Sequence, residues 1–135
     1  MKNKLIGSQS LNTDIAALLL RLIFGGIFVY YGYTKLTTFG QIVPIFKDVI
    51  GIGVKTSLVL VIFAEFFCGF LVLIGLLTRI TVIPIFITMA VAFFIAHAND
   101  PFQIKNLAFV YLLLSVVVFV LGSGKYSVDK FLLKK

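Results

Sequence analysis

Four long runs of apolar residues, separated by short polar segments, dominate the sequence. They extend over about 15–36, 56–77, 80–97 and 106–121. Each run is close to the roughly 20 residues that an α-helix needs to cross the hydrocarbon core of a bilayer. The capping residues Asn12 and Asp14 precede the first run, and Pro84 falls in the first turn or so of the third, where a missing N–H does least harm. The pattern predicts an all-α integral membrane four-helix bundle that forms one domain over residues 1–135.

The connection between the first two runs, from Thr37 to Val54, is the only long one. Apolar residues recur in it at helical spacing: Ile42, Ile45, Phe46, Val49 and Ile50. With Lys47 and Asp48 beside them, this spacing is typical of a short helix lying in the membrane interface. A packed surface loop is an equally weighted alternative, because Gly51 and Gly53 break any long helical run.

The composition supports a membrane protein, because 61% of the residues are hydrophobic, only 13% are charged, and the mean hydropathy is +1.14. A soluble domain carries about 45–50% apolar and about 25% charged residues. Lys2 and Lys4 precede an apolar run without a convincing cleavage site, so we interpret this run as a retained span and not as a secretory signal.

The net charge of +7 comes from basic residues scattered at span ends and in the tails, a distribution that indicates membrane topology and not one basic face for nucleic acid. Outside the spans, the basic residues on the side of the termini are Lys2, Lys4, Arg79, Lys125, Lys130, Lys134 and Lys135. Those on the opposite side are fewer: Lys35, Lys47, Lys55 and Lys105. The positive-inside rule therefore predicts that both termini are cytoplasmic.

Two ionisable residues, Arg21 and Glu65, lie inside the predicted spans. On the first helix Arg21 shares a stripe about 80° wide with Gly25 and Gly32, which lie one heptad apart and allow a neighbouring backbone to approach closely. Glu65 lies on a helix face of small residues. A charge near the middle of a bilayer costs roughly 2.5–3.5 kcal/mol on insertion scales, so Glu65 must be neutralised, paired or hydrated.

Depth argues against Arg21 as the partner of Glu65. Their backbones differ in depth by roughly 9 Å at 1.5 Å per residue, and their side chains lean apart, each toward the N-terminus of its own helix. Tyr31 leans toward the depth of the Glu65 carboxyl, so we predict a Tyr31–Glu65 contact, direct or through water. Lys35 and His97 lie in the same half of the bundle. We therefore predict an outer-half ligand pocket of Tyr31, Lys35, Glu65 and His97, with Glu65 as a proton relay.

Each of these residues also has a simpler interpretation. Arg21 can snorkel to the inner headgroups, His97 can be an interfacial residue at a helix end, and Tyr31 can belong to an aromatic belt. Glu65 can be a protonated carboxyl that joins two helices. For Glu65 we favour the functional interpretation, because intramembrane acids often mark proton or substrate paths.

The sequence contains one cysteine, Cys68, and one histidine, His97. A single cysteine excludes an internal disulfide and a cysteine-held iron–sulfur cluster, and one histidine cannot supply both axial ligands of a bis-histidine haem. No nucleotide-binding glycine loop is present, and no metal site is predicted. Any redox activity therefore requires a partner subunit or a diffusible quinone.

Three segments carry a family resemblance: LLRLIFGGIFVYYGYTKL (19–36), AEFFCGFLVLIGLLTR (64–79) and GSGKYSVD (122–129). In order and spacing they resemble the DoxX family. The matching positions are Arg21, Gly25, Gly32, Lys35, Glu65, Gly75, Thr78, Arg79, Gly124 and Tyr126. This sequence has Tyr31 where many relatives have histidine, and Cys68 where glycine is common.

The resemblance implies a small four-helix protein of the bacterial cytoplasmic membrane, related to membrane subunits of quinone-linked oxidoreductases. The leading hypothesis is a pocket for a non-covalently bound quinone, in which Tyr31 and Lys35 donate hydrogen bonds and Glu65 relays protons. The partner would be a soluble or membrane oxidoreductase subunit. The alternatives are a non-catalytic anchor or scaffold for a partner protein, or a small-solute or proton transporter that uses Glu65. A homo-oligomer is compatible with the sequence.

Overall fold

The computed structural model describes residues 6–46, 48 and 51–133. In this part of the chain all regular structure is helical, and four helices are long and apolar enough to cross a membrane. The first is α1 (Thr13–Thr37). The second is continuous through α3 (Val54–Ile62), the π-helical turn η1 (Phe63–Phe67) and α4 (Cys68–Ile74). The third joins α5 (Thr78–Val91) to the π-helical turn η2 (Ala92–Ala96), and the fourth is α6 (Phe102–Leu121). The predicted all-α membrane fold is confirmed.

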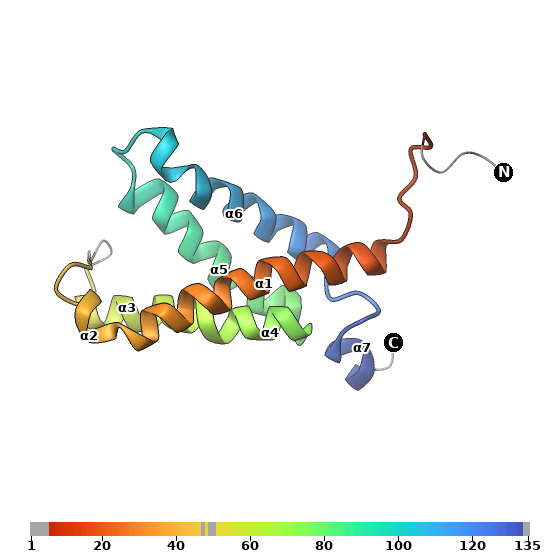
Figure 1. Cartoon of the computed structure of the whole chain (residues 1–135), viewed down its shortest axis with the longest axis horizontal. Coiled ribbons are helices and arrows are strands. Elements are labelled where there is room, and N and C mark those ends of the chain that lie inside the picture. The colour runs from red at the N-terminus through yellow and green to blue at the C-terminus, as the bar shows by residue number, and fades with distance from the viewer. Residues whose placement is uncertain (1–5, 47, 49–50, 134–135) are drawn as a thin grey trace.

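The four helices form two pairs. α1 packs along η1 and α4, and α5 packs along α6, while α4 and α5 join the pairs. Figure 1 shows the α5–α6 hairpin diverging from α1 toward the connections α2–α3 and α5–α6, which we call the loop end. The start of α1 and the end of α6 lie at the opposite, terminal end, together with the short helix α7 (Val128–Leu133). The bundle is therefore tight near the terminal end and open at the loop end.

Glycines let α1 lie close against the second helix. A Cβ added to Gly25 would lie 2.7 Å from the backbone nitrogen of Leu73, and one added to Gly32 would overlap the backbone of Phe66. Phe24 and Phe28 of α1 are buried in the core beside these contacts. The prediction that this stripe of small residues faces another helix is confirmed.

Two helix ends differ from the prediction. The second helix ends at Ile74 and not near Leu77, because Gly75 adopts a left-handed conformation with φ 81° and its N–H returns to the carbonyl of Leu71. The fourth helix begins at Phe102, four residues before the predicted start. Its first turn alternates the apolar Phe102 and Ile104 with Gln103 and Lys105, so the hydrophobic pattern alone placed the start too late.

The first connection contains a helix of four residues, α2 (Phe39–Ile42). A short helix between the first two spans, as predicted, is therefore present, but Ile45 and Phe46 do not belong to it and lie beyond α2 in a turn and in irregular structure. Lys47, Val49 and Ile50 lie outside the described residues. The loop is organised instead by the Asp48 carboxylate, which accepts hydrogen bonds from three backbone N–H groups, those of 51–53, and from the Ser57 hydroxyl.

These hydrogen bonds lower the pKa of Asp48, the largest effect being that of the Gly53 N–H, because they favour the charged carboxylate. A lowered pKa means that the stabilisation is present above the unfolded-state pKa and is lost as the pH falls through the folded-state pKa. We expect Asp48→Asn to accelerate amide hydrogen exchange at Gly53 at neutral pH and to have little effect below the folded-state pKa of Asp48. Amides in α6 serve as the control. Equal exchange at Gly53 in both proteins at neutral pH would contradict this role.

Candidate functional site

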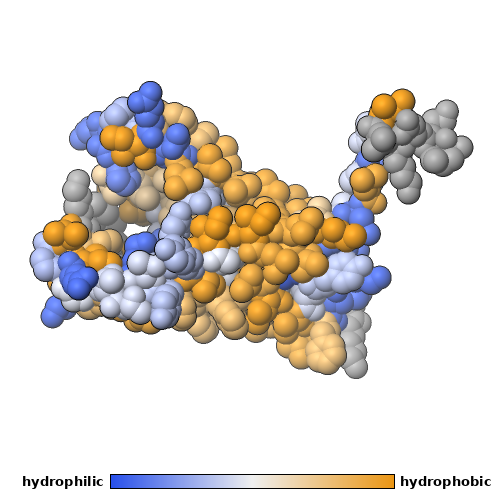
Figure 2. Space-filling view, viewed as in Figure 1, coloured by the Kyte–Doolittle hydropathy of each residue, from blue (hydrophilic) through white to orange (hydrophobic). Residues whose placement is uncertain are grey.

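A cavity of about 480 Å³ lies at the loop end, between the second and third transmembrane helices. In Figure 2 the molecule is hollowed between the end formed by α1 and α2 and the tip where η2 leads into α6. Most of the side chains that line the cavity are apolar. The polar and charged ones are Lys35, Ser57, Glu65, Thr88 and His97. Three of the four residues predicted to form a pocket thus border one cavity.

An ion pair occupies one wall. The Lys35 Nζ lies 2.7 Å from the Glu65 Oε1, and the Glu65 side chain is 5% exposed whereas that of Lys35 is 28% exposed. Lys35 lies in the last turn of α1 and leans back into the bundle, while Glu65 leans toward the loop end, so the two side chains converge. This pairing removes the cost of an isolated buried charge.

The predicted direct contact between Tyr31 and Glu65 is wrong. The Tyr31 hydroxyl lies 3.4 Å from that of Tyr111 on α6, and Tyr31 lines an apolar groove between α1 and α6 instead of the cavity. The rotation of α1 about its own axis explains the difference. Tyr31 precedes Gly32, the residue that contacts the second helix, so the Tyr31 side chain is turned about 100° away from that helix. The Lys35 ammonium lies near Tyr31 as well as Glu65, because its Nζ is 5.6 Å from the centre of the Tyr31 ring.

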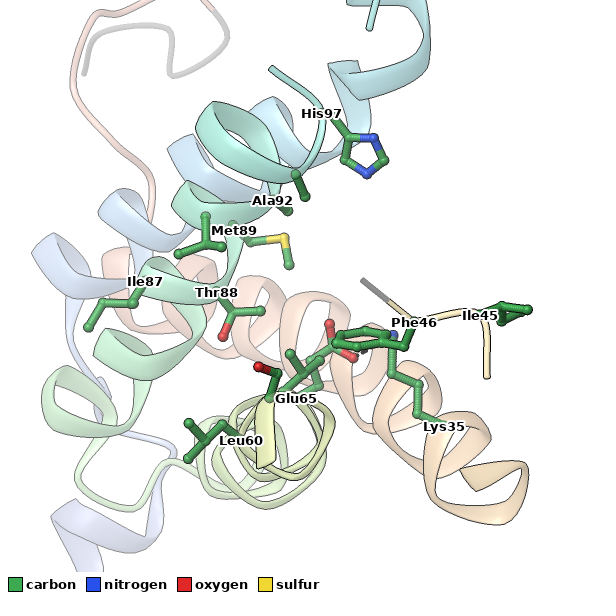
Figure 3. Close-up of a pocket in the computed structure, with 14 residues that line it drawn as sticks. Lys35, Ile45, Phe46, Leu60, Glu65, Ile87, Thr88, Met89, Ala92 and His97 are labelled. Atoms are coloured by element: carbon green, nitrogen blue, oxygen red, sulfur yellow. Dashed lines mark hydrogen bonds and ion pairs between the residues drawn. The ribbon is translucent and has the colours of Figure 1, made fainter. Parts of the chain in front are cut away.

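His97 lies on the wall opposite the ion pair, at the end of the third helix (Figure 3). Its Nδ1 is 2.7 Å from the Asp100 Oδ2, and both side chains are partly exposed. This bond occupies Nδ1, so the second ring nitrogen of His97, a residue that lines the cavity, is Nε2. Sequence reasoning missed Asp100, although an acid three residues after a histidine at a helix end was a usable signal.

Both π-helical turns border the cavity. Glu65 lies within η1, and Ala92 and Ala96 of η2 line the cavity next to His97. A π-helical turn inserts an extra residue into a helix and occurs frequently at functional sites. Here one turn contains Glu65 and the other immediately precedes His97. No propensity rule in the sequence marks either turn.

Arg21 forms its hydrogen bonds at the terminal end and does not contact Glu65, as its depth in the bundle predicted. It is 1% exposed and donates to the carbonyls of Leu73 at 3.1 Å, of Val72 at 3.5 Å and of Tyr126. Leu73 and Val72 lie in the last turn of α4, where carbonyls lack the usual intrahelical partner four residues on and the helix dipole favours a cation. The snorkelling interpretation is wrong, since the guanidinium is buried against backbone.

The other motif residues at this end also hold the chain in place. Arg79 donates to the carbonyls of Phe119 and Val120 at the end of α6. The Asp129 carboxylate accepts from the N–H of Leu77 and the hydroxyl of Ser123, which docks the tail against the start of α5. The motif residues Arg21, Gly75, Arg79 and Tyr126 therefore have structural roles away from the cavity.

Among the described residues, no group of three or more histidine, cysteine, aspartate or glutamate side chains could hold a metal ion. A family model described as DoxX matches residues 16–98. No curated protein and no solved structure shows a significant similarity to the chain. The matched segment covers more than half of the chain and includes both charged residues of the ion pair, and this multi-pass membrane protein therefore belongs to the DoxX family.

Proposed function

We propose that this protein binds a quinone in the cavity and acts as the membrane subunit of a quinone-linked oxidoreductase. The observation that carries the proposal is the Lys35–Glu65 ion pair, with an Nζ–Oε1 distance of 2.7 Å, at the wall of a mostly apolar cavity. An intramembrane acid and base bordering such a cavity mark a substrate or proton site.

The residues present fit a quinone ring. The volume of about 480 Å³ lies within the range of roughly 300–1,000 Å³ that is usual for small-molecule pockets, which combine apolar walls with few polar groups. The Lys35 ammonium has three N–H donors, and Glu65 uses one of them, so a second is available for a ring carbonyl.

Bound quinone would supply two-electron redox chemistry, in which reduction to the quinol consumes two electrons and two protons. The electrons would come from a partner subunit, since no group of three or more histidine, cysteine, aspartate or glutamate side chains gathers among the described residues. Glu65 would hold a proton next to the ring oxygen that Lys35 contacts. His97, oriented by Asp100, would hold a second proton at the opposite wall. With cytoplasmic termini, this cavity would lie in the outer half of the bacterial cytoplasmic membrane.

Extraction and mass spectrometry of protein purified in mild detergent should detect a bound quinone. Titration with quinone should show that Glu65→Gln weakens binding by about 10- to 100-fold, because it removes the carboxylate that holds the Lys35 ammonium at the cavity wall, and a hydrogen bond from a charged group contributes roughly 1.5–3 kcal/mol. Tyr31→Phe is the matched control, since it removes a hydroxyl that lies outside the cavity, and we expect unchanged affinity. Absence of quinone from the purified protein together with no binding on titration would refute the proposal.

Proton or solute transport is the second candidate, because the same ion pair inside the membrane also suits a transport path. Transport predicts flux in liposomes that Glu65→Gln abolishes, without stoichiometric quinone binding. A scaffold for a partner protein predicts neither flux nor quinone binding, and partner capture that Glu65→Gln leaves intact.

A further inference from the structure

We infer that the ligand enters the cavity sideways from the bilayer, through an opening between α3 and α5, and that its apolar tail lies in this opening. The inference rests on the proposed function for the identity of the polar head. It adds the route and the part of the ligand that lies outside the cavity.

Two apolar side chains define the opening. Leu60 of α3 and Ile87 of α5 both line the cavity, yet they are 50% and 54% exposed. A side chain that borders a cavity while half of its surface faces outward lies at the rim, and Leu60 and Ile87 mark it within the spans as Ile45 marks it at the loop end. Figure 3 shows the two residues on the same side of the cavity, away from Lys35.

The helix packing explains why the wall is open there. α5 packs on α4, on η1 and on α6, whereas α3 packs on α1 and η1 and has no substantial interface with α5. On the loop-end side of η1, α3 and α5 separate as the α5–α6 hairpin diverges from α1 (Figure 1). Side chains of Leu60 and Ile87 therefore form the edges of a gap and do not seal it.

The depth of the rim places the opening against lipid. Leu60 lies six residues from the start of α3 and Ile87 lies nine residues from the end of η2, which corresponds to roughly 9–14 Å below the loop-end helix termini. At this depth a side opening meets acyl chains and not water. The charged groups of Lys35 and Glu65 lie behind this opening, at the wall of the cavity.

This arrangement selects the chemical class of the ligand. A polar head can reach the Lys35–Glu65 pair while an attached apolar tail remains in contact with lipid between Leu60 and Ile87. A lipid-soluble quinone with a long apolar tail has this form. Such a ligand never needs to cross the headgroup region, because it reaches the opening by diffusion within the membrane.

The absence of tryptophan from the sequence allows a direct test by fluorescence. Leu60→Trp and Ile87→Trp each place one fluorophore at the rim, and Val59→Trp places one on an exposed neighbour of α3 that does not line the cavity. In liposomes, a long-tailed quinone should quench the two rim variants with saturation at one quinone per protein. The Val59→Trp variant should show only unsaturable quenching. Identical quenching curves for all three variants would overturn the inference.

The double substitution Leu60→Trp/Ile87→Trp narrows the opening while leaving the polar groups intact. We expect at least about tenfold weaker binding of a long-tailed quinone and a clearly smaller loss for a tail-less quinone, with unchanged helix content by circular dichroism. If the double variant binds both quinones as the wild type does, the lateral route is wrong and the proposed function stands. If the wild type binds neither quinone, the proposed function fails and the inference fails with it.

Discussion

Arg21→Met is expected to destabilise the folded bundle by about 3–6 kcal/mol, because two strong charge-assisted hydrogen bonds, each contributing roughly 1.5–3 kcal/mol, are lost from a buried site. The acceptors are the carbonyls of Leu73 and Tyr126, with Val72 as a weaker third. Arg21 connects the first half of α1 to the end of α4 and to the tail, so its loss should also release the tail. Unfolding by sodium dodecyl sulfate in mixed micelles, followed by circular dichroism, measures the free energy, and limited proteolysis measures tail release.

Arg79→Met is the matched control. Arg79 also donates to two carbonyls at a helix end, those of Phe119 and Val120, but it is exposed. Solvent and headgroups can replace its hydrogen bonds, so we expect a loss below about 1 kcal/mol. Equal effects of the two substitutions would show that burial of Arg21 does not determine its contribution.

Gly25→Ala is expected to destabilise the bundle by about 1–3 kcal/mol or more, because the added methyl group overlaps atoms that cannot move independently. It would lie 2.7 Å from the Leu73 nitrogen and 2.9 Å from the Gly69 carbonyl oxygen, both of which belong to the helix backbone. α1 and α4 must then separate, which also disturbs the Arg21 hydrogen bonds. The same unfolding measurement tests this expectation.

The adjacent glycine provides the control for Gly25. A Cβ on Gly26 would have no atom within 4 Å, so Gly26→Ala should leave stability unchanged or raise it by up to about 1 kcal/mol through helix propensity. Gly32→Ala should behave like Gly25→Ala, since its methyl group meets the backbone of Phe66. A destabilisation by Gly26→Ala as large as that by Gly25→Ala would contradict close packing as the cause.

The partner of Glu65 shows where sequence reasoning stops. Side-chain direction along one helix is set by the helix itself, so the separation of Arg21 from Glu65 was predictable. Tyr31 and Lys35 both lean toward the depth of Glu65, but Tyr31 meets Tyr111 and Lys35 meets Glu65. The rotation of α1 about its axis relative to the second helix decides between them, and a single sequence does not contain that angle.

Local rules determined the four spans, the stripe of Gly25 and Gly32, and the presence of a buried acid, because each depends on length or periodicity within one helix. Only the tertiary structure decided that Lys35 pairs with Glu65, that Asp48 organises the first connection, and that η1 and η2 border one cavity. It also decided that Arg21 caps α4, whose end at Gly75 meets α1 and the tail. These features depend on how separate helices are inclined and rotated against one another, which is set by the summed packing of the whole bundle.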